Sequence, residues 1–177
     1  RPGEKESRLR IATEASVMTS VDAIVVSTEQ EREDLSRLYD VPSSKTHVIS
    51  AGVDLELFKP IDKADARSSL GLTEENIVLS VGRLEPLKGL DVLIGAMSRL
   101  ESLDDTRLVI VGGQPGHDRE LERLKSIART LGLSDKVTFT GTMDQTDLPA
   151  YYSAADVFVM PSHYESFGLA ALEAMAC

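Results

Sequence analysis

The sequence predicts an α/β protein built on Rossmann-like parallel sheets, and three observations support this fold class. Short apolar runs rich in β-branched residues, such as those at 23–27 and 76–81, are typical of buried strands. Between such runs lie segments with apolar residues at helical spacing, such as 89–100, where Leu90 and Leu93 fall on one face. Strands and helices that alternate in this way form parallel sheets with crossover helices.

The individual elements follow from the same patterns and from end signals. A first helix is expected over 6–20. Thr28 is followed by three glutamates, which favour the positive end of a helix dipole, so a second helix begins there and ends before Pro42. The expected strands are 23–27, 47–50, 76–81, 107–111, 137–140 and 156–160. The further expected helices are 64–70, 89–100, 118–131, 147–153 and 168–176.

An irregular stretch near 51–60 interrupts this alternation and predicts a connection between two domains. We expect residues 1–57 to hold a trailing βαβ part of one domain and the crossover. Residues 58–177 then form the N-terminal part of a second domain. Because the sequence stops at Cys177 inside a predicted amphipathic helix, with no Gly, Asn or Pro to end it, we expect that second domain to be truncated.

Composition narrows the classes of partner. The 177 residues carry 19 Lys and Arg against 29 Asp and Glu, a net charge of −10, which argues against nucleic acid or an anionic membrane as the main partner. The apolar runs are far shorter than the roughly 20 residues of a spanning helix. One Cys excludes a disulfide scaffold and a Cys-based zinc site. We therefore expect a cytoplasmic protein, with membrane association of a longer parent left open.

A first candidate site follows the strand at 76–81. Gly82 would allow a ligand close to the backbone, and Arg83 and Lys88 place two cations before a helix, at the sheet edge where α/β proteins bind ligands. Two cations beside a helix N-terminus suit a diphosphate. The alternative is that Arg83 pairs with Glu85. The Walker A and G-x-G-x-x-G patterns are both absent.

A second candidate site lies at 161–173. Glu165 and Glu173 are eight positions apart, about 12 Å along a helix, whereas a glycosidase pair needs roughly 5 to 9.5 Å. Such carboxylates suit hydroxyls at the two ends of an extended ligand. The backbone amides between them form a helix N-terminus that suits an anion: Ser166, Phe167, Gly168 and Leu169. This layout predicts a nucleotide sugar; the alternative is that Glu165 caps the helix and Glu173 is solvated.

Two weaker candidates end the neighbouring strands. Gly112-Gly113 could approach the ligand or form an ordinary turn, and Gly141 could line a base pocket, although a simple turn is favoured. His163 could be an acid–base residue by type, but nothing at suitable spacing supports it, and a surface role is favoured. No residue is assigned as a metal ligand.

These motifs resemble a known family. GRLEPLKG at 82–89, IVGG at 110–113 and PSHYESFGLAALEAMAC at 161–177 resemble the donor-binding domain of retaining GT-B glycosyltransferases of the fourth family, whose signature is Glu-x7-Glu. The stretches DAIVVSTEQEREDL and HVISAGVDLELFKP resemble the last βαβ unit of the acceptor-side domain and its crossover. Within the family, the chain is similar to the branch of sucrose-phosphate synthases and the inositol-phosphate N-acetylglucosaminyltransferases of mycothiol synthesis.

The resemblance implies a role for each candidate residue. Arg83 and Lys88 would neutralise the diphosphate of the donor and stabilise it as a leaving group. Glu165 would hold hexose hydroxyls, and Glu173 the ribose hydroxyls. Three residues are thus expected to be catalytic: Arg83, Lys88 and Glu165. Six are expected to bind the donor: Gly82, Ser166, Phe167, Gly168, Leu169 and Glu173.

The resemblance also implies the reaction. It is metal-independent hexosyl transfer with retention, from a nucleoside-diphosphate sugar, with a UDP-sugar favoured, and with no cofactor. The acceptor is a sugar, a sugar phosphate or a polyol phosphate. Most of the acceptor-side domain is missing from the sequence, so the chain alone is expected to be inactive. The alternatives are a GT-B nucleotide-sugar epimerase and a sensor module that binds the same ligand without transfer.

Overall fold

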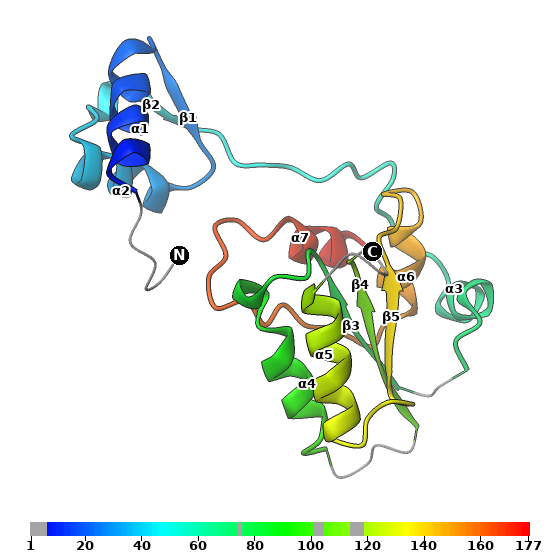
Figure 1. The fold of residues 1–177 in the computed structure, drawn as a ribbon. Coiled ribbons are helices and arrows are strands. Elements are labelled where there is room, and N and C mark those ends of the chain that lie inside the picture. The colour runs from blue at the N-terminus through cyan, green and yellow to red at the C-terminus, as the bar shows by residue number, and fades with distance from the viewer. Residues whose placement is uncertain (1–6, 74–75, 101–104, 114–118) are drawn as a thin grey trace. The chain divides into compact units, whose positions relative to one another are not determined.

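The computed structural model describes residues 7–73, 76–100, 105–113 and 119–177. The chain divides after Gly52 into two compact units, Arg1–Gly52 and Val53–Cys177, and each is described by itself (Figure 1). The described residues hold six strands, all paired in parallel, so the predicted α/β fold with parallel sheets is confirmed.

The first unit is a small two-stranded α/β piece. Its β-strands, β1 (Ile24–Val26) and β2 (Thr46–Val48), pair in parallel. Thr28 caps the second helix as predicted, because its side chain accepts the N–H of Glu31, whose carboxylate accepts the N–H of Ser27. The strand expected at 47–50 begins and ends earlier. The helical elements are α1 (Arg8–Ser20), α2 (Glu29–Tyr39) and the 3₁₀ turn η1 (Ser43–Lys45).

The second unit is built on a four-stranded parallel sheet in the order β5-β4-β3-β6. Its strands are β3 (Asn76–Val81), β4 (Thr106–Val111), β5 (Val137–Gly141) and β6 (Val157–Phe158). The strand expected at 156–160 is only two residues long, because β6 pairs with β3 at Val78 and Leu79 alone. Its chain then leaves the sheet towards the segment at 161–168.

The helices of the second unit match the predicted set with shifted ends. They are α3 (Lys63–Leu70), the 3₁₀ turn η2 (Pro86–Lys88), α4 (Leu90–Met97), α5 (Arg119–Thr130), α6 (Leu148–Ala154) and α7 (Leu169–Ala176). The helix expected at 89–100 is shorter, because Gly89 is left-handed (φ +63°) and the last α-helical residue is Met97. Residue 6 of the helix expected at 6–20 and residue 118 of the helix expected at 118–131 lie outside the described residues.

The core lies on both faces of this sheet. Leu108 and Ile110 of β4 pack with α4 and α5, which cover one face in Figure 1, whereas Val109 and Val111 pack on the other face with Phe58 and α6. Side chains alternate between the faces of a strand, so burial of both faces requires the continuous apolar runs seen in the sequence.

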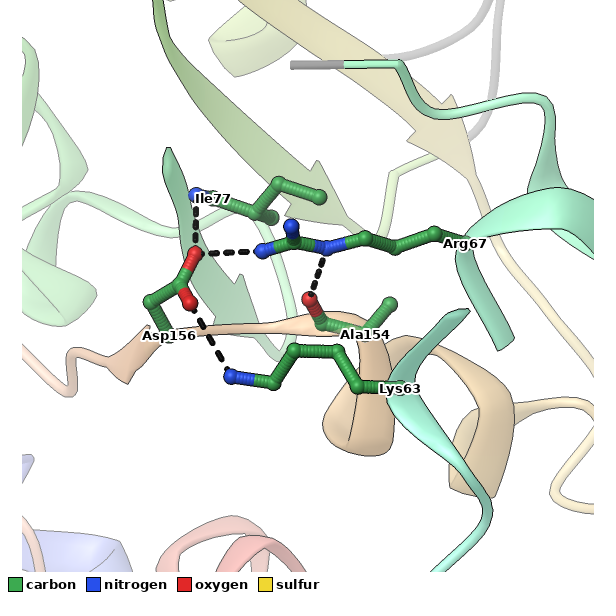
Figure 2. Close-up of polar contacts among 5 residues, drawn as sticks. All are labelled: Lys63, Arg67, Ile77, Ala154 and Asp156. Carbon is green, nitrogen blue, oxygen red and sulfur yellow. Dashed lines mark hydrogen bonds and ion pairs between the residues drawn. The ribbon is translucent and has the colours of Figure 1, made fainter. Parts of the chain in front are cut away.

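A polar cluster fixes the start of β6 (Figure 2). The Asp156 carboxylate pairs with Lys63 at 3.0 Å and Arg67 at 2.6 Å and accepts the N–H of Ile77 at 2.7 Å. Arg67 also donates to the Ala154 carbonyl at 3.0 Å. Burial raises the pKa of Asp156, but the hydrogen bonds from Ile77 and Lys63 and the charge of Arg67 more than offset it, so the pKa is lowered. The cluster ties α3 and β3 to β6, which leads into the candidate site.

Candidate functional site

A cavity of about 310 Å³ opens at the carboxyl end of β3. Eight of the nine sequence-predicted residues line it: Gly82, Arg83, Lys88, Glu165, Ser166, Phe167, Gly168 and Leu169. Three of the other lining residues fall within the second candidate stretch, but the sequence assigned no role to any of them: Ser80, Val81, Leu90, Ile110, Met160, Pro161, Ser162 and Ala170. Two segments 77 positions apart, one after β3 and one after β6, thus form a single site, as parallel topology places strand ends at one edge.

Glycines bring the loops after β3, β4 and β5 together beside this cavity. The Gly82 N–H donates to Val111 O at 3.0 Å, and the Gly112 N–H donates to Gly141 O at 2.8 Å. A Cβ on Gly112 would lie 1.9 Å from the Gly82 carbonyl oxygen, so only glycine permits this approach. Gly112 and Gly141 form the adjoining strand ends but do not line the cavity.

The turn at 86–89 packs directly on the segment after β6. The His163 N–H donates to Leu87 O at 2.9 Å, and a Cβ on Gly89 would lie 2.3 Å from the Pro161 carbonyl oxygen. The close approach therefore requires glycine at position 89, where φ is +63°. The packing of this turn on the segment after β6 places Lys88 opposite Glu165.

Lys88 and Glu165 form an ion pair in the cavity wall. Lys88 Nζ lies 2.6 Å from Glu165 Oε2, and the two side chains are 24% and 25% exposed. The hydrogen bond from Lys88 lowers the pKa of Glu165 against the effect of burial, and the Ser162 hydroxyl and the Ser166 N–H lower it further. Glu165 is therefore a carboxylate at neutral pH, with hydrogen bonds that fix its position.

Arg83 adopts the alternative that the sequence left open. Its guanidinium lies 2.7 Å from the Glu85 carboxylate, and its side chain is 78% exposed, so it contributes a largely solvated charge to the cavity lining. Both predicted cations thus have carboxylate partners in this structure. An anionic ligand would have to compete with those carboxylates or share the cations with them.

The N-terminus of α7 supplies backbone donors to the same cavity. Gly168 is the N-cap residue, and as a glycine it has no side chain to cap the helix. Its carbonyl accepts the N–H groups of Ala171 and Leu172. The N–H groups of Leu169 and Ala170 have no acceptor among the described residues. Free N–H groups and the positive end of a helix dipole attract an anion.

Glu173 lies one helical turn beyond Leu169 and outside the cavity lining. Its Oε2 accepts the hydroxyl of Tyr152 on α6 at 2.7 Å. The structure thus supplies the partner that a carboxylate on this apolar helix requires. No sequence pattern pointed to Tyr152, because an aromatic residue in a predicted helix is ordinarily only a core residue.

The part of the chain that the structure describes contains neither a candidate membrane span nor a candidate metal cluster. Within 7–73, 76–100, 105–113 and 119–177, no helix combines the length and apolarity needed to cross a bilayer. The same ranges contain no group of three His, Cys, Asp or Glu side chains placed to hold a metal ion.

Comparison with known proteins places the chain in a family. The profile of the family described as "Glycosyl transferases group 1" matches residues 62–177, and that of "Glycosyltransferase Family 4" matches residues 2–57. The chain is 40% identical, over 98% of its length, to D-inositol 3-phosphate glycosyltransferase 2 of Catenulispora acidiphila. It is 42% identical, over 97%, to D-inositol 3-phosphate glycosyltransferase of Actinosynnema mirum. It covers 42% and 43% of those proteins.

A solved structure agrees with this placement. Sucrose-phosphate synthase from Thermosynechococcus elongatus superposes with a TM-score of 0.85 at 38% identity, over 98% of this chain and 43% of that one. The parallel sheets, with a cavity at the strand ends, define the fold as that of GT-B glycosyltransferases. The chain belongs to the group 1 glycosyltransferase family. It spans about two fifths of the length of the curated relatives it matches.

Proposed function

We propose that the chain provides the donor-binding part of a retaining glycosyltransferase that moves a hexosyl group from a nucleoside-diphosphate sugar to an acceptor without a metal. One observation carries this proposal: Lys88, Glu165 and the uncapped start of α7 surround a single cavity. A cation and free N–H groups bind a diphosphate, while a carboxylate beside them accepts hydrogen bonds from sugar hydroxyls. Few other ligands need both kinds of partner so close together.

The proposed rate enhancement comes from stabilising the leaving diphosphate. As the bond between the sugar and the diphosphate breaks, negative charge grows on the distal phosphate. Lys88 Nζ and the N–H groups of Leu169 and Ala170 are fixed donors beside that position, so they need little reorganisation when the charge develops. Arg83, exposed at the cavity mouth, would add a second positive charge.

Glu165 has two tasks in this mechanism. It orients Lys88 through their ion pair, and it accepts hydroxyl groups of the hexose with its remaining lone pairs. Retention requires the acceptor to attack from the face that the diphosphate leaves. Glu165 would hold the sugar so that this face is open.

Glu173 extends the site along α7 towards the nucleoside. Its position one turn beyond the cavity suits the ribose hydroxyls of a ligand whose diphosphate lies at the start of the helix. The proposed ligand thus runs along the helix, with its hexose at Glu165 and its ribose at Glu173. We favour a UDP-sugar because the motifs resemble those of the family branch noted above.

The acceptor is proposed from the relatives. Those reported above are named as D-inositol 3-phosphate glycosyltransferases and share 40–42% of their aligned residues with this chain. A polyol phosphate is therefore the favoured acceptor class. Since the chain spans about two fifths of those proteins, we expect transfer to need the full-length protein.

The test uses the full-length protein with UDP-, GDP- and ADP-hexoses, and with D-inositol 3-phosphate or a hexose phosphate as acceptor. The expected product is a glycoside whose anomeric configuration, read by NMR, equals that of the donor, formed at the same rate in EDTA. Isomerisation of the donor without acceptor would identify an epimerase instead. Nucleotide binding without any turnover would identify a sensor, and no nucleotide binding would refute the proposal.

A further inference from the structure

A buried phenol holds the carboxylate that extends the candidate site. Tyr152 is 6% exposed, and its ring lies between Phe58 and Phe158, with centroid separations of 6.1 and 5.6 Å. These rings leave the phenol little freedom to turn. Its hydroxyl reaches out of the core to Glu173 Oε2 at 2.7 Å. The orientation of the hydroxyl is therefore set by the packing of the ring in the core.

In this hydrogen bond Tyr152 is always the donor and Glu173 the acceptor. Burial, the hydrogen bond to Glu173 and the charge of Glu173 all raise the pKa of Tyr152 far above its ordinary value, so the phenol stays neutral and donates at every physiological pH. An ionised carboxylate offers about four lone-pair positions, of which Tyr152 occupies one. Glu173 Oε1 accepts no hydrogen bond from the described residues and stays available to a ligand.

Helix α7 is held in the fold by apolar contacts as well as by this hydrogen bond. Ala174, Ala176 and Cys177 already pack against the apolar cluster that contains Tyr152. The hydroxyl therefore adds to the orientation of one side chain more than to the docking of the helix. A glutamate that is held in one rotamer loses less conformational entropy when it binds a ligand.

We propose that Tyr152 is a positioning residue that presents Glu173 to the ribose hydroxyls of the donor and so gives the site its preference for ribonucleotides over 2′-deoxyribonucleotides. This inference rests on the proposed function, because it needs a nucleotide along α7. Tyr152 itself touches no substrate. Its effect passes through the lone pairs that it leaves open on Glu173.

The test compares UDP with 2′-deoxy-UDP by calorimetry on the full-length protein and its Tyr152→Phe variant. If the full-length protein binds GDP or ADP more tightly than UDP, that nucleotide and its 2′-deoxy form are compared instead of UDP and 2′-deoxy-UDP. We expect the variant to bind the ribonucleotide about tenfold more weakly, as for a lost hydrogen bond to a charged group, and the deoxynucleotide nearly as well as the wild type. The ratio of the two affinities then falls towards one.

Tyr151→Phe is the matched control, since it removes a phenol hydroxyl from the neighbouring position of α6, and that hydroxyl makes no hydrogen bond to Glu173. We expect its affinity ratio to equal that of the wild type. If Tyr152→Phe leaves the ratio unchanged, or weakens both nucleotides equally, Tyr152 is only structural and the inference fails while the proposed function stands. If the wild type binds no nucleotide, both fail.

A second variant keeps the inference testable if Tyr152→Phe does not fold. Glu173→Ala should lose the same preference for ribose, because it removes the carboxylate through which Tyr152 acts. Where Tyr152→Phe does fold, it should have no further effect on the ratio in the Glu173→Ala background. A Glu173→Ala variant that still prefers the ribonucleotide would overturn the inference.

Discussion

The ion pair between Lys88 and Glu165 makes a prediction with an unusual sign: removing a charge from Glu165 should tighten the binding of the product. Any diphosphate that reaches Lys88 competes with a carboxylate already 2.6 Å away. Glu165→Gln keeps the size of the side chain and removes its charge. We therefore expect the variant to bind UDP more tightly than the wild type.

The magnitude follows from burial. Exposed ion pairs contribute less than about 1 kcal/mol, whereas removing one partner of a buried pair costs about 3–5 kcal/mol. At 24% and 25% exposure the pair lies between these limits, and we take about 1.5 kcal/mol, or roughly tenfold in the affinity for UDP. A UDP-sugar gains less, because it loses hydrogen bonds from its hydroxyls to the carboxylate, each worth about 1.5–3 kcal/mol.

Calorimetry on the full-length protein with UDP, UDP-glucose and UDP-N-acetylglucosamine measures these differences. Glu85→Gln is the control, because it removes a carboxylate from the largely exposed partner Arg83, and its effect should stay below about twofold. The gain for UDP should shrink at high salt. A Glu165→Gln variant that binds UDP no better than the wild type would refute the competition between carboxylate and diphosphate.

Three further predictions concern Lys88, Gly89 and Asp156. Lys88→Ala should lower kcat/KM of the full-length enzyme by about 30-fold, or ~2 kcal/mol, and an unchanged rate would remove Lys88 from catalysis. Gly89→Ala should lower both the free energy of unfolding and the affinity for UDP, because its Cβ would lie 2.3 Å from a carbonyl oxygen. Gly95→Ala in α4 is the control, because a Cβ at that position meets no atom within 4 Å. It should raise the free energy of unfolding in urea by about 0.5–1 kcal/mol. Asp156→Asn should cost about 1–3 kcal/mol at pH 7. Because the pKa of Asp156 is lowered in the folded state, its contribution to the free energy of unfolding is present above about pH 4 and is lost as the pH falls further. The difference between Asp156→Asn and the wild type in urea unfolding should therefore shrink at low pH. A difference that stays constant with pH would contradict this.

The sequence was sufficient for the fold class and for the meeting of the two motifs. Hydrophobic periodicity and end signals located the strands that the described residues contain. The parallel topology then required Gly82 and Gly168 to lie at one edge of the sheet. Element ends were less predictable. The helix expected from 89 begins at Leu90, because Gly89 is left-handed where the chain passes close to the Pro161 carbonyl of a distant segment.

The pairing of charges could not be predicted from the sequence. Lys88 lies 77 positions from Glu165, and nothing local indicates that the two side chains meet. Tyr152 and Glu173 are also separated in sequence, by 21 positions, and their contact depends on how α6 and α7 pack. Such contacts are set by the tertiary arrangement, which is why residue types and spacing predicted the gathering of the candidate residues but not the interactions among them.

A crystal structure of the full-length protein with UDP would show whether a nucleoside diphosphate binds where Lys88 meets the start of α7. We expect the distal phosphate within about 3 Å of Lys88 Nζ and of the N–H groups of Leu169 and Ala170, with Lys88 drawn away from Glu165. A diphosphate bound elsewhere, with the ion pair intact, would contradict it.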